Sequence, residues 1–196
     1  MTVRKGFRVS VETFGMKGGG AALTVGMFDS VYTDVTFSIL SELINHDMNF
    51  IALNPAANTL NEPGERADIL IINAKPETPS AFICEAAVVD TDNKDILKFL
   101  TKYNARVVSY GFNHKASVTA SSIHDDKVVF CVQRAFQTLS GAEVYQREFS
   151  VCTGFYTINK IGDKNISYSQ YVTNCLLPAV TTALTAGVPA EDLTRL

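Results

Sequence analysis

The sequence has little of several features that mark specialised classes of protein. Its 196 residues include only 6 prolines, and 46% are hydrophobic, which predicts a folded, globular chain without long disordered tracts. No basic run is longer than the pair Arg4 and Lys5, and the formal net charge is -3, so nucleic acid is not expected as a partner. Because no stretch of about 18 uninterrupted apolar residues exists, neither a membrane-spanning helix nor a membrane partner is expected.

Cysteines are few and scattered. Cys84, Cys131, Cys152 and Cys175 form no C-x-x-C pair and stand among apolar or small residues, which favours reduced core thiols over disulfides or metal ligands. The start of the chain, as far as Phe14, contains charges and no long apolar run, so no secretory signal is predicted. Together these observations predict a cytoplasmic protein.

Hydrophobic periodicity in the first half predicts alternating strands and helices. The segment 7–13 alternates apolar and polar residues, which predicts a strand, and the glycines at 15–20 end it. The run 68–73 is continuously apolar and β-branched, which is typical of a strand buried on both faces. Further strands are predicted at 21–27, 50–53, 81–89 and 106–111, helices at 35–46 (with Thr33 and Asp34 as a cap) and 94–103, and a loop at 54–66.

The pattern changes after Ala116. Segments 117–121, 127–133 and 143–151 alternate apolar and polar residues, with turns at 124–126 and 140–141, which predicts an antiparallel meander with one face in water. A helix over 167–186 contains Pro178, and Pro189 begins a last short helix.

These elements predict the α/β class. We expect a single domain over residues 1–196, with a central, partly parallel sheet flanked by helices and extended by the antiparallel β-meander. Residues 1–67 are assigned to the same domain as the rest.

Few residues identify a site by pattern alone. The glycine-rich loop at 15–20, with Lys17, has free N–H groups that could hold an anion, but it lacks G-x-x-x-x-G-K-[ST], so a glycine turn is favoured over a phosphate site. His46, His114 and His124 lack partners at metal-ligand spacing, and no metal site is expected. No G-x-S-x-G elbow exists, so no catalytic nucleophile is nominated.

Two acidic clusters remain. Asp90, Asp92 and Asp95 are expected to cap the helix that begins near Lys94, and the acidic pair 125–126 is expected to turn a hairpin. In both places this structural role is favoured over magnesium binding or general-base work.

A series of short segments in the second two-thirds of the chain resembles one family. Residues 86–93 (AAVVDTDN) are similar to V-x-N-x-D-D, residues 106–114 to a strand ending in T-[YF]-G, and residues 115–123 to A-D-[VY]-x-A-x-[ND]-I. Residues 169–193 are similar to a helix that begins G-x-H-N-V-x-N, with Asn174 at the second Asn, and residues 68–73 to a strand ending in T-N-I. In this order the segments, over about 68–196, resemble the central ATP-binding domain of the Mur ligase family.

The resemblance implies a fold and a ligand. Mur ligases are ATP-dependent enzymes that join amino acids to carboxylates in bacterial peptidoglycan assembly, so ATP and magnesium are the implied cofactors. With the glycine loop added, the candidate nucleotide-binding residues are Lys17, Gly18, Gly19, Asn73, Lys75, Gln170 and Asn174.

Departures from the family pattern limit the implied activity. The phosphate loop G-T-N-G-K-[ST] occurs nowhere, and Gln170 and Tyr171 replace the His and Asn of H-N-V-x-N. We therefore predict a catalytically degenerate Mur-ligase-like domain that binds a nucleotide, a cell-wall precursor or a partner protein. Two alternatives stay open: an active ATP-dependent ligase joining an acid to an amino acid, and an oligomeric interaction module that pairs through its meander edge without a small-molecule site.

Overall fold

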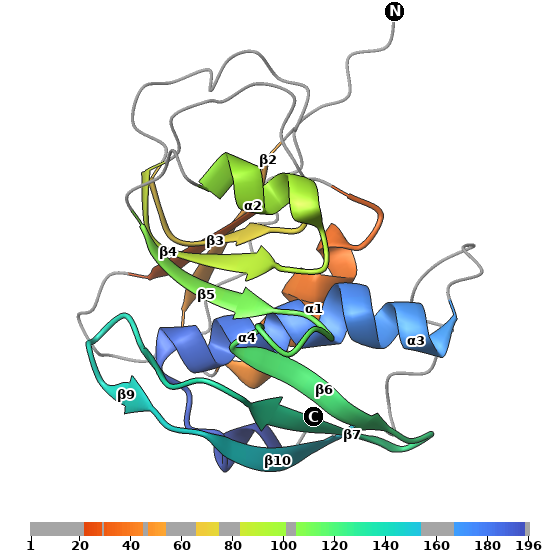
Figure 1. Cartoon of the computed structure of the whole chain (residues 1–196). Coiled ribbons are helices and arrows are strands. Elements are labelled where there is room, and N and C mark those ends of the chain that lie inside the picture. Colours follow the sequence, from red (N-terminus) through yellow and green to blue (C-terminus); the bar gives the residue numbers. More distant parts are fainter. Residues whose placement is uncertain are drawn as a thin grey trace, which may run out of the picture.

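One eight-stranded sheet organises the part of the chain that the computed structural model describes (Figure 1). That part comprises residues 22–28, 30–44, 47–53, 66–74, 83–100, 105–153 and 167–194. The strand order across the sheet is β10-β7-β6-β5-β4-β3-β1-β2. The predicted strand at 7–13 and most of the predicted loop at 54–66 lie outside the described residues.

The larger part of the sheet is parallel. Its strands are β1 (Leu23–Phe28), β2 (Met48–Leu53), β3 (Arg66–Ile72), β4 (Ile83–Asp90), β5 (Arg106–Tyr110) and β6 (Val118–Ile123). Ile69 to Ile72 of β3 are all buried, which confirms the prediction of a strand covered on both faces. The strands predicted at 21–27, 50–53, 81–89 and 106–111 are also present, with ends that differ by a few residues.

The predicted antiparallel meander continues the same sheet. β7 (Lys127–Val132) pairs with β6 and with β10 (Arg147–Cys152), and their buried residues alternate with exposed or half-buried ones. The single strand predicted over 143–151 is wrong in one respect, because the chain changes partner within it. β9 (Glu143–Val144) instead forms a small hairpin with β8 (Phe136–Gln137), and the exposed Tyr145 lies between β9 and β10.

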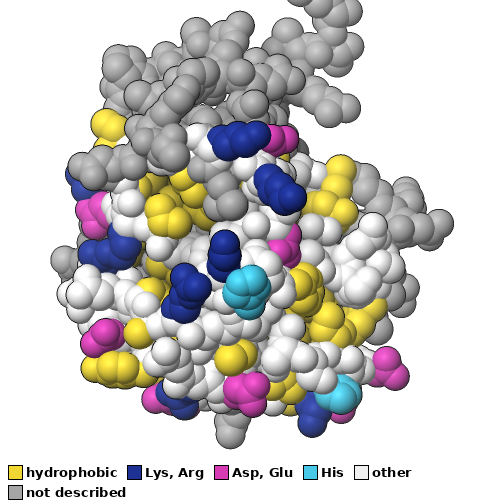
Figure 2. Space-filling model, in the orientation of Figure 1, with side chains coloured by type: hydrophobic (Ala, Val, Ile, Leu, Met, Phe, Trp, Pro, Cys, Tyr) yellow, Lys and Arg dark blue, Asp and Glu magenta, His cyan; other side chains and the backbone are white. Residues whose placement is uncertain are grey.

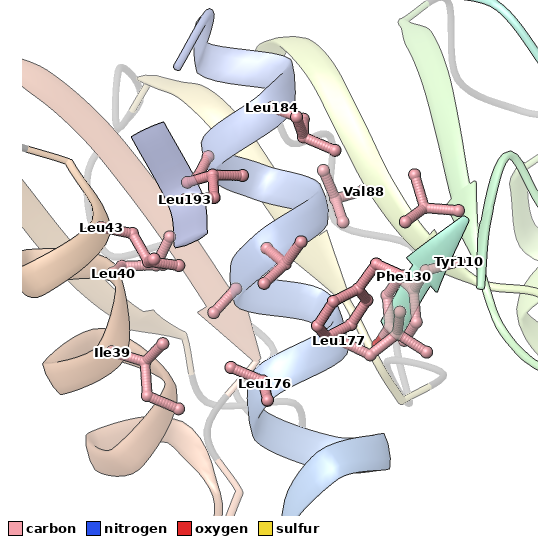
Figure 3. Close-up of a cluster of buried hydrophobic side chains, with 14 of the residues drawn as sticks. Ile39, Leu40, Leu43, Val88, Tyr110, Phe130, Leu176, Leu177, Leu184 and Leu193 are labelled. Carbon is pink, nitrogen blue, oxygen red and sulfur yellow. The ribbon is translucent and has the colours of Figure 1, made fainter. Parts of the chain in front are cut away.

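Two helical segments cover one face of the sheet. Helix α1 (Thr33–Leu43) buries Thr36, Ile39, Leu40 and Leu43, the spacing of one helical face. The carboxyl-terminal helix runs from α3 (Tyr168–Tyr171) through the π-helical turn η2 (Val172–Leu176) to α4 (Leu177–Ala186). Figure 3 shows this helix between the leucines of α1 and the strand residues Val88 and Phe130, so it is the centre of the main core.

Pro178 explains why the predicted helix over 167–186 changes type. Proline has no N–H, so the backbone carbonyl of Asn174, four residues earlier, has no α-helical donor. The wider turn before it uses an i→i−5 bond, in which the Leu177 N–H donates to the Val172 carbonyl. The extent of this helix and its helical character were therefore predictable from periodicity, whereas the π-helical turn depends on the position of Pro178.

The opposite face of the sheet has a smaller core. Helix α2 (Lys94–Leu100) places Ile96 against Phe28, Leu70, Ile72 and Val89. The short helix predicted after Pro189 is a 3-10 turn, η3 (Asp192–Thr194), in which the Asp192 N–H donates to the Pro189 carbonyl. No helix in the described ranges is both long and apolar enough to cross a membrane.

Candidate functional site

The sheet changes its direction of winding between β1 and β3. From β1 the chain passes through α1 to β2 on one side, whereas β3, on the other side of β1, leads to β4 and β5. In open α/β sheets, ligands bind at the carboxyl ends of the strands at such a switch point. Ser30 follows β1 and Asn73 follows β3, so these two residues lie at the position where a ligand is expected.

Ser30 and Asn73 are in contact across this switch point. The Asn73 Nδ2 group donates to Ser30 Oγ over 3.4 Å, which is a long hydrogen bond. The other amide atom, Asn73 Oδ1, is buried and has no hydrogen-bond partner among the described residues. Leaving such an acceptor unpaired costs about 1–3 kcal/mol, so a ligand N–H or O–H group that reached it would be favoured.

The turn between β1 and α1 uses its own hydrogen-bonding groups. Ser30 N–H donates to Thr33 Oγ1 over 2.9 Å, and Tyr32 N–H donates to Ser30 Oγ over 3.2 Å. Thr33 N–H donates to the Ser30 carbonyl, and the Thr33 side chain is almost completely buried. Three backbone donors that could face an anion are thereby occupied within the turn, so this turn is not an open cradle for phosphate.

The structure also corrects the predicted helix cap at this place. Thr33 is the first residue of α1, and the N-cap residue is Tyr32, whose side chain makes no capping hydrogen bond. The Thr33 hydroxyl instead accepts from Ser30, upstream of the helix, which orders the turn rather than the first helical N–H groups.

The remaining predicted site residues are placed differently. Gln170 lies in a capping box: Ser167 Oγ accepts from the Gln170 N–H, and Gln170 Oε1 accepts from the Ser167 N–H over 3.0 Å. Asn174 is half-buried in η2, and Thr36 of α1 hydrogen-bonds the neighbouring Cys175. Lys17, Gly18, Gly19 and Lys75 lie outside the described residues, as does His46.

The first acidic cluster forms a turn, with one correction. Asp90 Oδ1 accepts from the Asp92 N–H, but the residue that caps α2 is Asn93, whose Oδ1 accepts from the Asp95 N–H over 3.1 Å. The second cluster turns the β6–β7 hairpin, where the His124 N–H donates to the Lys127 carbonyl. In the described ranges, no group of three or more His, Cys, Asp or Glu side chains is placed to hold a metal ion.

Asp92 joins two loops at the carboxyl end of the sheet. Its Oδ2 accepts from the Phe112 N–H over 2.7 Å, and its Oδ1 accepts from Asn113 Nδ2 over 2.9 Å. Asn113 Nδ2 also donates to Thr91 Oγ1 over 2.8 Å. The loop after β4 and the loop after β5 are therefore fixed to each other, so their exposed side chains are held together.

Burial alters the acid–base properties of two groups beside these loops. Desolvation raises the pKa of Asp90, and burial followed by the nearby Asp90 charge raises the pKa of Tyr110 well above its usual value. Tyr110 therefore keeps its phenolic proton at neutral pH. The nearby Cys175 thiol is also held neutral by burial.

An apolar hollow on the α2 face was not predicted. It is small and only partly enclosed. Ligand sites usually combine an apolar wall with a few convergent polar groups. The lining here consists of apolar residues with one thiol, which is not the composition of such a site. The lining residues are Gly26, Ile51, Leu53, Ala67, Leu70, Ile83 and Cys84.

All four cysteines are free thiols, but the prediction that they lie in the core is right only for Cys175. Cys84 and Cys131 are half-buried, and Cys152 is exposed at the end of β10. Burial raises the pKa of Cys175 to about 12 and that of Cys84 to about 11. Successive side chains of a strand point to opposite faces, so Cys152, which follows the buried Val151, lies on the solvent-facing side of β10.

This difference predicts the order of thiol modification. With iodoacetamide at pH 8, we expect Cys152 to be alkylated first and Cys175 last, because only the thiolate reacts and the high pKa keeps Cys175 protonated until well above pH 8. Peptide mass spectrometry over time measures the order. The same treatment in urea serves as the control, because all four sites should then react alike; faster labelling of Cys175 than of Cys152 in the folded protein would contradict the burial described here.

Comparison with known proteins adds no relative. No protein-family model matches the chain, and no curated protein matches it. The α/β class and the mostly parallel sheet are therefore defined by the structure itself.

Proposed function

We propose that this protein is a Mur-ligase-like, catalytically degenerate binding domain. Its ligand is a nucleotide, either free or as the carrier group of a cell-wall precursor. The ligand binds along the carboxyl ends of the parallel strands, with its first polar contact at Ser30 and Asn73. The assignment to the Mur ligase type rests on the sequence segments between 68 and 193, and the location of the ligand rests on the topology of the sheet.

One observation carries the location. Asn73 stands at the switch point, and its Oδ1 is buried without a hydrogen-bond partner while its Nδ2 makes only a long bond. Buried polar groups are normally satisfied, and an exception needs an explanation. Because Oδ1 is covered, a base or sugar group can donate to it only if the atoms over it shift, and it then replaces the water that this acceptor lost on folding.

The degenerate character follows from the β1–α1 turn. A ligase that forms an acyl phosphate must grip the β- and γ-phosphates of ATP, and family members do so with a glycine–lysine loop. In this protein the turn after β1 has Ser30, Tyr32 and Thr33 donating to groups of the turn itself. The active-ligase alternative therefore has less support than binding alone; its test residues remain Lys17, Asn73, Lys75 and Asn174.

The interaction-module alternative also has less support. It needs a strand edge that can pair with another subunit, and the meander ends in β10. That strand begins with the exposed charges Arg147 and Glu148, and Arg147 forms an ion pair with Glu191 at 3.0 Å. Charged side chains on an edge strand oppose edge-to-edge pairing.

Thermal unfolding with added nucleotide tests the proposal. A ligand that binds only the folded state raises the melting temperature, and at a hundredfold excess over Kd the gain is about 2.7 kcal/mol, or about 5–10 °C for a chain of this length. We expect such a rise with ATP. Asn73→Ala should remove more than half of it, whereas Asn49→Ala, an exposed amide on β2, should leave it intact.

The unliganded variants separate binding from folding. Because Asn73 makes one long hydrogen bond and leaves an acceptor unpaired, Asn73→Ala is expected to melt within about 2 °C of the native protein. If nucleotide raises the melting temperature of Asn73→Ala and Asn49→Ala equally, Asn73 is not part of the site. The absence of any rise with millimolar nucleotides would overturn the proposed function.

A further inference from the structure

We propose that Lys94, Lys115 and Arg134 form a surface that binds the phosphate groups of the nucleotide. This cationic surface binds phosphate in place of the β1–α1 turn, in which the N–H groups of Ser30, Tyr32 and Thr33 donate within the turn itself. This inference rests on the proposed function for the identity of the ligand, a nucleotide. The affinity of the surface for phosphate groups does not depend on the proposed function. The three cations come from the start of α2, the β5–β6 loop and the segment after β7.

Hydrogen bonds bring these three segments together. Asn113, two residues before Lys115, donates to Thr91 and Asp92, which immediately precede α2. The Lys115 N–H itself donates to Asn113 Oδ1 over 2.8 Å. On the other side, the Gln133 N–H donates to the Ser117 carbonyl over 2.8 Å, so the chain at Arg134 lies beside the start of β6.

The three cations are exposed and uncommitted. Lys94, Lys115 and Arg134 are solvent-exposed, and the ion pairs found in the described ranges involve other residues: Arg66–Glu85, Lys98–Asp95 and Arg147–Glu191. Figure 2 shows Lys and Arg side chains gathered with a histidine in the middle of one face of the molecule. Exposed His114 precedes Lys115 in the same loop.

The nearest acidic side chains have other partners. Asp92 directs both carboxylate oxygens at the N–H groups of the loop after β5, and Asp90 accepts from the Asp92 N–H. Both carboxylates keep their negative charge, but neither forms an ion pair with the three cations in the described ranges. The cations therefore remain available to an anion from solution.

Position along the sheet suits one extended ligand. β3 and β5 are separated by β4, so the ends of these strands lie about 10 Å apart at the usual interstrand spacing. A nucleotide that donates to Asn73 at the end of β3 can extend its phosphates toward the loop after β5. Arginine and lysine are the side chains that bind phosphate oxygens, and arginine can do so with two parallel hydrogen bonds.

Binding of inorganic tripolyphosphate tests the surface without the nucleotide base. We expect calorimetric titration at low salt to show binding that weakens steeply with added salt. Lys115→Ala and Arg134→Ala should each weaken it at least about tenfold, in line with the loss of one charge-assisted hydrogen bond. Two controls are available: Lys127→Ala removes an exposed cation at the far end of β7, and Phe112→Ala truncates an exposed neutral neighbour in the same loop. Both should bind within about twofold of the native protein.

The outcomes separate this inference from the proposed function. If ATP raises the melting temperature but Lys115→Ala and Arg134→Ala bind tripolyphosphate like the native protein, the surface is refuted while nucleotide binding stands. If tripolyphosphate binds as expected but no nucleotide does, the surface stands and the proposed function fails. If Lys127→Ala loses as much affinity for tripolyphosphate, the effect comes from net charge alone and the proposed surface is refuted. Tighter binding of poly-glutamate than of tripolyphosphate would also refute it.

Discussion

Replacement of Phe130 by alanine is expected to lower the free energy of unfolding by about 3–5 kcal/mol. Phe130 is fully buried in the middle of β7 and stacks on Phe149 of β10, with ring centroids 5.7 Å apart. Its ring lies beside Leu177 of the central helix (Figure 3). The substitution removes the buried ring and leaves a cavity where the meander meets α4. The protein therefore loses the free energy of burying the ring and bears the additional cost of the cavity.

Urea unfolding followed by circular dichroism measures this loss. Tyr145→Ala is the matched control, because it also removes an aromatic ring but from a side chain that is 64% exposed between β9 and β10. We expect the control to change stability by less than about 0.5 kcal/mol. A loss below about 1 kcal/mol for Phe130→Ala would mean that the meander does not share a core with the parallel strands.

The fold was predictable where one physical rule decides the local structure. The continuous apolar run of β3 indicated a strand covered on both faces, and the alternation in β7 and β10 indicated a sheet with one wet face. By contrast, the break after Val144 was missed, although Val144 and Tyr145 are adjacent apolar residues and 146–148 are all polar, so the alternation slips where the backbone changes its pairing partner. Periodicity reports which face a side chain occupies, and it carries no information about which strand lies alongside.

The candidate site was only partly predictable for a similar reason. Asn73 was nominated from the resemblance of residues 68–73 to a strand ending in T-N-I, but its partner Ser30 is 43 residues away, and the contact depends on the order of strands in the sheet. Ser30 had a weaker signal that was not used: it is a polar residue between an apolar strand and a helix. Gln170 had a clear signal, since Ser167 and Gln170 have the spacing of a capping box, and that local role occupies its side chain.

Replacement of Gly111 by alanine is expected to destabilise the protein by about 2–4 kcal/mol. Gly111 follows β5 with a φ of +149°, a region that residues with a side chain rarely adopt. An added Cβ would also lie 2.9 Å from both Asp92 Oδ2 and Thr91 Oγ1. The substitution therefore strains the backbone and pushes away the carboxylate that holds the loop after β5.

Gly141→Ala separates the two causes. Gly141 also has a positive φ, +87°, in the turn of the β8–β9 hairpin, but nothing lies within 4 Å of an added Cβ. Its substitution should cost only the conformational part, about 1 kcal/mol. Equal losses for the two variants, measured by urea unfolding, would show that Asp92 and Thr91 are not the reason for the glycine at 111.

Because Lys115 depends on the same loop, Gly111→Ala should also weaken tripolyphosphate binding at a temperature where the variant is folded, whereas Gly141→Ala should not. Strong binding by a folded Gly111→Ala variant would mean that the cationic surface does not need the contacts of Asp92 with the loop after β5, and that its three cations find the phosphate without being held in place.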